Sequence, residues 1–470
     1  MNKALKALLF AVFVFFSIPS AAQCAGQFPD NDSQRARLVN YKHAGPQDIE
    51  TNLSDNDFLL EIASDTWGYF RDVVDKENSL PLDNIMVFKD HTNPNSYTSV
   101  TNVGLYLMCV VSAYDFKFIT REEAIGRIKK TLSTLEGLEK WNGLFYNYYE
   151  TISLKNSGQF VSSADNGWLV AGLIVARSAF SEVSPQADNL IKGVDFSKLY
   201  DKFEGQLFLG YEGDKGKLSP YHYGTFYTEP RVASYIAIAK GDAPPQHWFK
   251  MYRSMPADWS WQTQQPTAGK ERNYENVKVP ENYYVHDNFK YIPSWGGSLF
   301  EALMPSLVLK EQELGKKGLA VNNKTMVDAH IWYALKQQKY PLWGISPCAI
   351  PGNMSGYAEY GVPFLGVKGY EDLSVVTPHA SFLALSVRPK EAIKNIRKFA
   401  AIPDMYGEYG FYDAYNVKND VIAAKYLCLD QAMSFISLDN YLNNGAIRNR
   451  FHQDPMIKAK EHLLEMEEIF

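Results

Sequence analysis

The stretch GTFYTEPRVASYIAIAKGD, residues 224–242, contains the pattern that decides the fold. A turn rich in glycine and aromatic residues leads through the carboxylate of Glu229 into an apolar run long enough to form a helix. Pro230 suits the first turn of this helix, because the N–H group that proline lacks has no intrahelical partner there. Apolar residues then recur at helical spacing. We therefore predict a helix with Glu229 at its N-terminal end, where the helix dipole favours a charged carboxylate.

The same unit of an aromatic loop and an apolar helix recurs from residue 58 onward. The predicted helices cover residues 58–75, 99–116, 120–138, 164–180, 195–205, 230–240, 296–310, 324–338, 378–385, 389–400, 423–442 and 457–468. Short strand-like pieces such as LFYNYYE lie between them, and no Pro/Ser-rich linker divides the chain. We predict an all-α fold, an α/α toroid of inner and outer helices around a central cleft, with aromatic-rich loops and minor β hairpins. A two-domain helical protein is the structural alternative.

The first residues have the pattern of a secretory signal peptide. Lys3 and Lys6 precede an apolar run at 7–18 that is too short to span a bilayer comfortably, and small residues follow it. Cys24 raises the alternative of a lipid anchor, which we disfavour because the residue before it is not small. The expected organisation is a signal peptide at 1–22, an N-terminal arm at 23–51 and one large domain at 52–470. The mature protein is expected in the periplasm or outside the cell.

Composition narrows the class of ligand. The formal net charge of -6 argues against a nucleic-acid partner, which needs a basic surface. Aromatic residues make up 14% of the chain, and the clusters FYNYYE, PYHYGTFY and ADWSWQ are more polar than a buried core. Tyrosine and tryptophan rings stack on flat apolar faces while their polar tips form hydrogen bonds. We therefore expect a cleft that binds a flat, polar, neutral molecule such as a sugar.

The cysteines and histidines give no sign of a metal site. The cysteines lack CxxC spacing and the histidines lack an HExxH motif. Cys109 and Cys428 lie in apolar runs and are expected to be core thiols. His222 and His379 lie beside aromatic loops, and for both a structural role is the better interpretation. We expect no metal, no organic cofactor and, in the absence of a heptad pattern, a monomer.

Four carboxylates are candidates for catalysis: Glu229, Asp165, Glu301 and Asp430. Each also has a structural explanation. Glu229 and Asp165 are able to cap helices, the helix dipole accounts for Glu301, and a buried ion pair accounts for Asp430. The structural explanation of Glu229 also includes an ion pair with Arg231. Glycoside hydrolysis needs two carboxylates, one that protonates the leaving oxygen and one that acts as nucleophile or base, but spacing alone does not select the pair.

Six longer stretches resemble successive motifs of the glycoamylase-like family. They are GTFYTEPRVASYIAIAKGDAPPQHWF, SWGGSLFEALMP, YPLWGISPCAIP, YAEYGVPFLGVKGYEDLSVVTPHASFLAL, GEYGFYDAYN and YLCLDQAMSFISLDNYL. The family includes bacterial endo-β-1,2-glucanases and the glycoamylase-like domain of cyclic β-1,2-glucan synthases. The resemblance runs from about residue 58 to the C-terminus, with the motifs in the family's order.

The resemblance implies an (α/α)6 catalytic barrel at residues 52–470 and activity on a β-glucan, with β-1,2 linkages expected. It implies that Glu229 is the proton donor or its direct partner and that Asp165 is an acid of the same cleft. The second acid or base is sought among Asp165, Glu301 and Asp430. The candidates for substrate binding are Trp168, Tyr223, Tyr227, Trp295 and Trp343 as stacking residues, with Arg231, Glu359, Asp413 and Gln431 as polar residues of the cleft.

Three hypotheses for the function stay open. The first is an exported glycoside hydrolase, for which inversion is favoured because the free glucanases of the family invert. The second is a transglycosylase with the same cleft, since TEPR and GGSLFEALMP are closer to the synthase-type domain while LDQ is closer to the free glucanases. The third is a non-catalytic glycan-binding protein of the envelope, which would keep the aromatic residues and tolerate the loss of Glu229.

Overall fold

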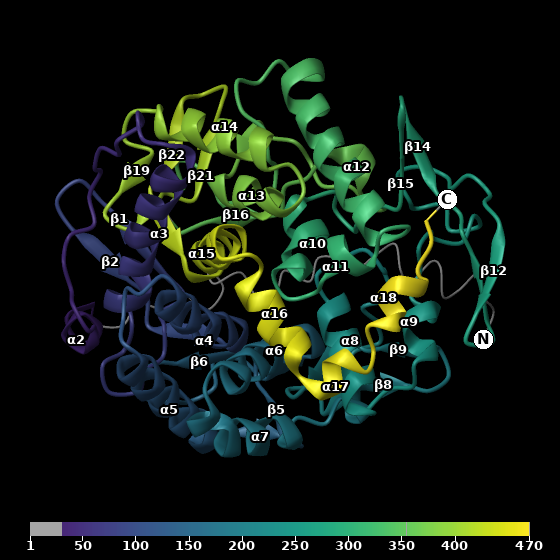
Figure 1. Ribbon diagram of the computed structural model, residues 1–470, viewed down its shortest axis with the longest axis horizontal. Helices are drawn as coiled ribbons and strands as arrows, with labels where there is room; N and C mark the ends of the chain where they lie inside the picture. Colours follow the sequence, from purple (N-terminus) through teal and green to yellow (C-terminus); the bar gives the residue numbers. More distant parts are fainter. Residues whose placement is uncertain (1–30, 354, 470) are drawn as a thin grey trace.

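The computed structural model describes residues 31–353 and 355–469. The predicted signal peptide and Cys24 lie outside these residues. Figure 1 labels the helices and strands. From the predicted arm, residues 31–51 form one helix, α2 (Asn31–Arg37), followed by irregular backbone.

Six helices form an inner ring. They are α4 (Val100–Asp115), α6 (Ser163–Ala179), α8 (Arg231–Lys240), α10 (Leu299–Leu303), α13 (Pro378–Leu383) and α15 (Cys428–Leu442). Helix α4 packs on α6 and α15, α6 packs on α8, and α13 packs on α10 and α15 (Figure 1). The ring closes between α8 and α10, where Arg231 donates to the carbonyl oxygens of Glu301 and Ala302 at 3.3 and 2.6 Å.

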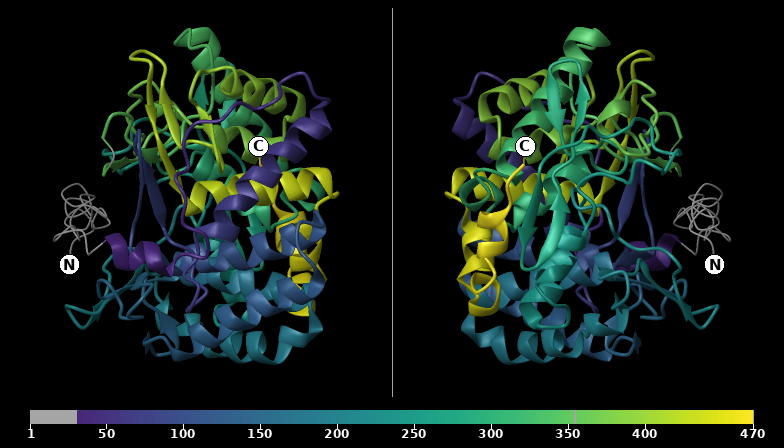
Figure 2. Two further views of the ribbon diagram at one scale, coloured as in Figure 1. Left: turned by 90° about the vertical axis from the view of Figure 1, so that its left-hand side faces the viewer. Right: turned by 90° about the vertical axis from the view of Figure 1, so that its right-hand side faces the viewer.

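A second set of helices packs against the outside of this ring. They are α3 (Asp55–Asp72), α5 (Arg121–Gly137), α7 (Ser184–Gly193), α9 (Gln246–Lys250), α12 (Leu319–Trp332) and α14 (Pro389–Ala400). Each of them contacts an inner helix, for example α5 on α4, α12 on α10 and α14 on α13. The remaining α-helices are α11 (Glu311–Leu314), α16 (Ala446–Gln453), α17 (Pro455–Lys458) and α18 (His462–Met466). Figure 2 shows α16 and α17, in yellow, along one side of the body, with β1 and β2 toward the other.

Short helical turns complete the helical content: η1 (Ser181–Val183), η2 (Phe196–Leu199), η3 (Met304–Leu307), the π-helical η4 (Tyr333–Gln337), η5 (Pro363–Leu365) and η6 (Ala384–Ser386). The strands are short and antiparallel, and several of them lead directly into inner helices. Three sheets have three strands: β2 (Thr92–Pro94), β1 (Asn84–Val87) and β23 (Lys425–Leu427); β11 (Lys217–Leu218), β10 (Gly210–Glu212) and β7 (Phe160–Ser162); β18 (Val375–Val376), β21 (Ala414–Asn416) and β22 (Val421–Ala423). In the first sheet, Ile85 is paired with Pro94 on one side and with Tyr426 on the other.

The other strands form two-stranded pairs. These are β3 (Tyr97–Ser99) with β6 (Tyr148–Glu150), β4 (Lys140–Trp141) with β5 (Leu144–Phe145), β8 (Tyr200–Asp201) with β9 (Gln206–Leu207), β12 (Glu271–Tyr274) with β13 (Val277–Pro280), β14 (Tyr284–His286) with β15 (Phe289–Tyr291), β16 (Cys348–Ala349) with β17 (Tyr357–Ala358), and β19 (Tyr406–Gly407) with β20 (Gly410–Phe411). The prediction of a mostly helical chain with minor hairpins is confirmed.

Most predicted helices are present, and three predictions need correction. Residues 457–468 do not form one helix, because a turn at 459–461 separates α17 from α18. Residues 195–205 form the turn η2 and the hairpin β8–β9, because Gly205 adopts a positive φ and backbone and side-chain hydrogen bonds to Asp201 close a turn. Residues 423–427 are not helical, since β22 ends at Ala423 and β23 pairs with β1 before α15 begins at Cys428. The helices α2, α7, α9, α11 and α16 were not predicted.

The three described cysteines, Cys109, Cys348 and Cys428, are free and buried, as predicted for Cys109 and Cys428. Among the helices of the described chain, none combines the length and hydrophobicity that a bilayer crossing requires.

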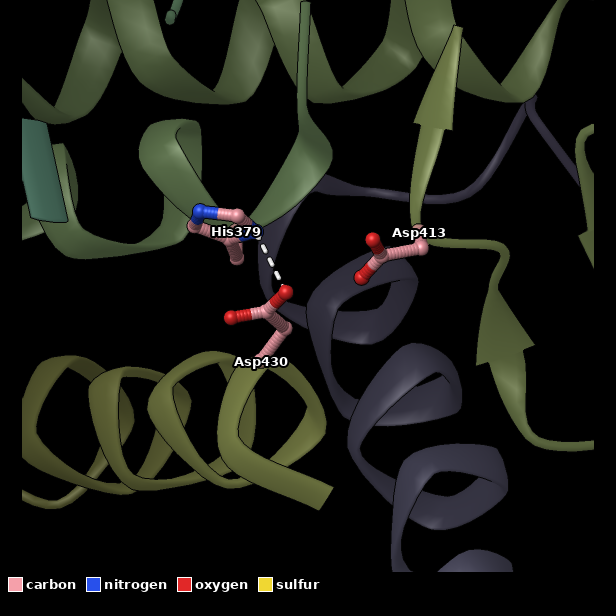
Figure 3. A group of neighbouring side chains, drawn as sticks. All are labelled: His379, Asp413 and Asp430. Atoms are coloured by element: carbon pink, nitrogen blue, oxygen red, sulfur yellow. Dashed lines mark ion pairs between the residues drawn. The ribbon is translucent and has the colours of Figure 1, made fainter. Parts of the chain in front are cut away.

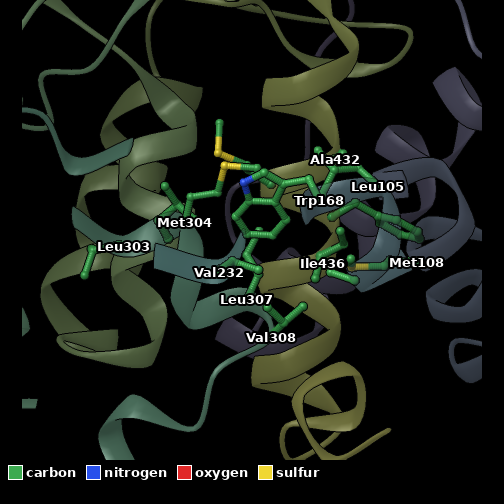
Figure 4. Packing of buried hydrophobic residues seen from close by; sticks show 14 of the residues in the cluster. Leu105, Met108, Trp168, Val232, Leu303, Met304, Leu307, Val308, Ala432 and Ile436 are labelled. Atoms are coloured by element: carbon green, nitrogen blue, oxygen red, sulfur yellow. The ribbon is translucent and has the colours of Figure 1, made fainter. Parts of the chain in front are cut away.

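Apolar side chains from the inner helices fill the centre of the ring. Trp168 of α6 is 2% exposed and lies among Leu105 of α4, Val232 of α8, Met304 of η3 and Ile436 of α15 (Figure 4). A tryptophan of this size buries a large apolar area where four other elements meet. This central packing fixes the inner helices relative to one another.

Glycines allow α4 and α6 to cross at very short range. A Cβ atom on Gly104 would lie 2.4 Å from the carbonyl oxygen of Trp168, and one on Gly172 would lie 2.1 Å from the carbonyl oxygen of Gly104. These neighbours are backbone atoms, so they have no rotamer to change. The two helices therefore depend on residues without side chains at this crossing.

We predict that Gly104→Ala destabilises the protein by about 1–3 kcal/mol, because overpacking at a backbone contact forces the helices apart. The measurement is chemical or thermal unfolding of both proteins. The matched control is Gly126→Ala in the exposed middle of α5, where an added Cβ meets nothing within 4 Å. Alanine has the better helix propensity, so this control should gain about 0.5–1 kcal/mol. Equal effects of the two substitutions would contradict the close crossing.

Candidate active site

Four inner helices carry a polar residue at their third position: Asn102 in α4, Asp165 in α6, Glu301 in α10 and Asp430 in α15. In the first three, a serine caps the helix by accepting a hydrogen bond from the backbone N–H of that same residue. The caps are Ser99, Ser162 and Ser298, at 3.0, 3.2 and 3.2 Å. The serine cap therefore fixes the residue at which each helix starts, and with it the position of the polar side chain in the first turn.

The first turns of neighbouring inner helices touch. Thr101 of α4 donates a hydrogen bond of 2.7 Å to the carboxylate of Asp165 in α6. His379 of α13 lies with its Nδ1 atom 3.5 Å from Oδ2 of Asp430 in α15. Between α15 and α4, Asp83 accepts from the side chain of Asn102 at 2.8 Å, and its carbonyl oxygen accepts from the backbone of Cys428 at 2.8 Å. The polar residues therefore gather at one end of the ring.

Glu229 lies directly before Pro230, the N-terminal cap of α8, as the sequence predicts. Its side chain is partly buried. Burial raises the pKa of Glu229 to about 8, and the negative charges of Glu301, Asp165 and Glu359 act in the same direction. A carboxyl group with this pKa keeps its proton at neutral pH. We name these four acids, Asp165, Glu229, Glu301 and Glu359, the carboxylate cluster.

Glu301 is held by its own loop. Its carboxylate accepts from the hydroxyl groups of Ser294 and Ser298, both at 2.9 Å, and from the backbone N–H groups of Gly296 and Ser298. With the reciprocal bond from Ser298 this forms a capping box. Burial raises the pKa of Glu301, while these hydrogen bonds lower it. The net effect is a raised pKa, and the arrangement holds the carboxyl group of Glu301 in one place, where its charge acts on Glu229.

Two tyrosines border the carboxylate cluster. Burial raises the pKa of Tyr223, and the charges of Asp165, Glu229 and Glu359 raise it further. Tyr370, which was not predicted, has its pKa raised by burial and by Glu301, Glu359 and Glu229. Its ring lies against the bare Cα of Gly296, where a Cβ would lie 1.9 Å away. The glycine pair that opens GGSLFE is the signal in the sequence that a bulky side chain needs this space.

Trp295, in the loop that holds Glu301, belongs to a group of three tryptophans. The ring centroids of Trp261 and Trp295 are 5.6 Å apart, and those of Trp259 and Trp261 are 5.9 Å apart. All three side chains are partly exposed. Of the predicted stacking residues, Trp295 and Tyr223 therefore keep accessible surface. Trp259 and Trp261 belong to the ADWSWQ cluster but had not been singled out as residues.

Six predicted binding residues are buried, and four of them, Trp168, Tyr227, Arg231 and Trp343, pack inside the protein rather than at an open surface. Trp168 lies one turn below Asp165 on the same face of α6, so it points into the core of the ring rather than to its open end. Trp343 is 3% exposed and Tyr227 is fully buried. Arg231 forms a buried ion pair with Glu311 at 2.7 Å, so it is not the partner of Glu229.

Asp413, Asp430 and Gln431 lie in a second group. Each is at most 5% exposed. Asp430 and Asp413 lie next to His379, and Gln431 donates to the carbonyl oxygen of Phe411 at 2.9 Å. Burial and the charges of Asp430, Asp413 and Glu359 raise the pKa of Tyr357, so this tyrosine interacts with acids of both groups. Asp430 is thus near the other three predicted acids but has different immediate neighbours.

A cavity of about 360 Å³ lies elsewhere, around the C-terminal end of α15. It is bordered by Ser437, Asn440 and Arg448 and contains no member of the carboxylate cluster. Because α15 begins at Cys428, the cavity is separated from Asp430 by most of the helix. This cavity is therefore separate from the candidate site that contains the carboxylate cluster.

Comparison with known proteins adds to this geometry. Residues 262–455 match the family model Glycoamylase, described as "Putative glucoamylase". The cyclic β-(1,2)-glucan synthase NdvB of Rhizobium meliloti (strain 1021) is 25% identical over 556 residues, which cover 87% of this chain and 18% of that protein. The exo β-1,2-glucooligosaccharide sophorohydrolase (non-reducing end) of Parabacteroides distasonis is 23% identical over 460 residues, covering 91% of this chain and 59% of that protein.

The predicted resemblance to the glycoamylase-like family is confirmed. Among solved structures, the endo-β-1,2-glucanase from Chitinophaga pinensis, in complex with sophorotriose and glucose, superposes with a TM-score of 0.70. It is 18% identical and covers 88% of this chain and 98% of that one, so it supports the fold. The chain thus spans a small part of the synthase and somewhat over half of the sophorohydrolase.

We predict that Glu229→Gln removes a pH-dependent loss of stability. The pKa of Glu229 is about 8 in the folded protein against 4.5 as its ordinary value. Between these values the unfolded chain releases the proton and the folded chain keeps it, so stability falls as pH rises from 4.5 to 8. Glutamine does not ionise. The difference in Tm, variant minus wild type, should therefore increase between pH 5 and pH 8.

The control is Glu391→Gln, an exposed acid in the first turn of α14. Its Tm difference from wild type should stay constant over the same range. A constant difference for Glu229→Gln as well would mean that Glu229 titrates like an exposed carboxylate.

Proposed function

We propose that this protein is a glycoside hydrolase that cleaves β-1,2-glucan by carboxylate acid–base catalysis. The observation that carries the proposal is the carboxyl group of Glu229, which keeps its proton near neutral pH at the head of α8 beside three other acids. Glycoside hydrolysis needs one protonated acid at the leaving oxygen and a second carboxylate nearby. The carboxylate cluster offers both.

Glu229 acts as the general acid. An acid with a pKa near the working pH is protonated in the resting enzyme and is still strong enough to give up its proton in the transition state. Glu301 keeps this pKa high, because its fixed charge disfavours ionisation of Glu229. The four hydrogen-bond donors around its carboxylate make Glu301 a poor nucleophile, so its proposed role is to place a negative charge beside Glu229.

Asp165 is the proposed second acid or base. The hydroxyl of Thr101 orients one of its oxygens at 2.7 Å, and Ser162 caps its helix. Its charge acts on Glu229 and on Tyr223, so the three groups are near neighbours. Asp430 fits the role less well because it is 3% exposed and belongs to a different group of side chains.

The substrate class rests on the relatives. Two curated relatives and one structural neighbour carry β-1,2-glucans or β-1,2-glucooligosaccharides in their names. The partly exposed Trp259, Trp261 and Trp295 suit a sugar chain, since aromatic faces pack against the apolar faces of pyranose rings. Tyr223 and Glu359 are the proposed polar contacts.

The same proposal includes architecture and location. We infer that the six inner and six outer helices form an (α/α)6 toroid and that residues 52–470 are one catalytic domain. Residues 1–22 are proposed as a signal peptide for export to the periplasm or the medium. The enzyme is proposed to act as a monomer on an oligo- or polysaccharide.

Transglycosylation is the second candidate. The alignment with the cyclic glucan synthase favours it, because that alignment covers 87% of this chain at 25% identity. A transglycosylase would use the same acids but transfer the glucosyl unit to a sugar hydroxyl instead of water.

We predict that Glu229→Gln lowers kcat on β-1,2-glucan by about 10²–10⁴-fold, the usual contribution of general acid–base catalysis. The measurement is release of reducing ends by purified wild type and variant, with β-1,3-, β-1,4- and β-1,6-glucans as comparison substrates. Glu391→Gln is the matched control and should retain wild-type rates. A folded Glu229→Gln enzyme with near-normal turnover would leave Glu229 as a capping residue only.

A second prediction concerns the product. An inverting hydrolase leaves room for water between its carboxyl groups, about 6.5–9.5 Å, whereas a retaining enzyme brings them to about 5–5.5 Å. We expect inversion, so the first product of β-1,2-glucan cleavage should be the α-anomer in early NMR spectra. A β-anomer, or products longer than the substrate, would contradict an inverting hydrolase and support the transglycosylase candidate instead.

A further inference from the structure

A histidine and two aspartates meet beside the carboxylate cluster. His379 is the second residue of α13, Asp413 directly precedes β21, and Asp430 is the third residue of α15. The three side chains point toward one another (Figure 3). One ligand atom from each lies within 4.8 Å of the others, and all three residues are at most 3% exposed. We name this group the His–Asp cluster.

Hydrogen bonds within the described chain do not satisfy the His–Asp cluster. Neither carboxylate oxygen of Asp430 has a hydrogen-bond partner there, and the same holds for Oδ1 of Asp413 and Nδ1 of His379. The remaining oxygen of Asp413 accepts from the backbone N–H of Ala349 at 2.6 Å. A buried carboxylate without donors is costly, so these atoms need either a proton or a positively charged partner.

Acidic groups outnumber cations around the His–Asp cluster. Lys425 is the buried cation that interacts with Asp413, and it interacts with Asp83 as well. Asp83 also acts on Asp430. Three carboxyl groups therefore share one ammonium group. The other titratable groups facing the aspartates, the thiols of Cys348 and Cys428 and the phenol of Tyr357, are neutral acids whose pKa values are raised by burial.

We propose that His379, Asp413 and Asp430 bind a divalent transition-metal ion, Zn²⁺ in the first place. An imidazole with two carboxylates suits zinc, whereas calcium and magnesium prefer oxygen ligands alone. Two carboxylates and a divalent ion together are neutral, so the ion would supply the positive charge that the cluster lacks.

The surroundings fit such an ion. A small cavity of about 10 Å³ borders all three residues together with Thr66, Gln431 and Ser434, leaving room for a water as fourth ligand. The Nε2 atom of His379 lies 3.4 Å from the hydroxyl of Thr377, a contact that orients the ring with Nδ1 toward Asp430. The ligands are 34 and 17 positions apart in the chain, so a search for short motifs does not find them.

The ion would tie α13, α15 and the segment before β21 to the β16–β17 hairpin. Asp413 accepts from Ala349 in β16, and Ala349 is paired with Tyr357 in β17. Glu359 of the carboxylate cluster follows β17 by one residue. The three ligands are thus positioning residues with respect to the proposed catalysis, while metal binding itself does not depend on the proposed function.

The test is a titration of the chelator-treated, full-length protein with Zn²⁺ in competition with a chromophoric chelator. We expect one Zn²⁺ per chain and a Tm that rises with Zn²⁺. Asp430→Asn should weaken binding at least 10-fold and abolish the rise in Tm. Asp439→Asn is the matched control, since Asp439 is a buried aspartate of the same helix outside the His–Asp cluster, and it should bind like wild type.

His379→Gln keeps both carboxylates and is the second variant if Asp430→Asn does not fold; it too should bind at least 10-fold more weakly. The proposal is overturned if treated wild type does not bind Zn²⁺, if the variants bind like wild type, or if Ca²⁺ or Mg²⁺ binds more tightly than Zn²⁺. In the first case the two aspartates share a proton instead, and Asp430→Asn should then leave Tm unchanged or raise it. Because no readout is an activity, failure here is distinct from failure of the hydrolase proposal.

Discussion

The N-terminal first turns of the inner helices are the constraint on which the site depends. A helix leaves its first N–H groups without intrahelical partners, so a serine cap and a polar residue three positions later are favoured there. In this protein α4, α6 and α10 all begin with that pattern. Because the inner helices start at the same end of the ring, groups selected for capping also meet in space. Capping and chemistry are two consequences of one arrangement, not competing explanations of the same acid.

Glu229 is positioned in a different way, because Pro230 provides no side-chain cap for α8. Two residues later, Arg231 is buried and forms an ion pair with Glu311 while donating to the backbone of α10. Removing one partner of a buried pair of this kind typically costs about 3–5 kcal/mol. The acid is therefore held from both sides, by α8 in its own segment and by α10 and α11 from a distant one.

The sequence predicted helix starts well where a local signal was present. Ser99 and Thr120 cap α4 and α5, and α14 has the predicted bounds. It predicted Glu229 and Asp165 as neighbours only through the family resemblance, since nothing local tells which helix ends meet. The hairpin at 195–205 was missed because apolar residues at helical spacing also suit a twisted pair of short strands.

Aromatic residues were the main source of error in the site. In a chain with 14% aromatic residues, many rings fill the core, and composition does not separate these from rings on the surface. Trp168 shows the difficulty. It follows Asp165 by three positions, so it lies about one helical turn deeper, inside the ring. His379 shows the reverse case: it was given a structural role, yet it meets two aspartates that come from other parts of the chain.

The buried thiols have a consequence for where this fold can exist. Cys109, Cys348 and Cys428 are fully buried and free, and burial raises the pKa of each. A thiol reacts as its thiolate, so these side chains resist oxidation and disulfide exchange. The described chain therefore needs no oxidant to reach its native state and none to keep it. Its stability should be the same in a reducing cytosol and in an oxidising compartment, which makes the fold indifferent to redox conditions during synthesis, transport and use.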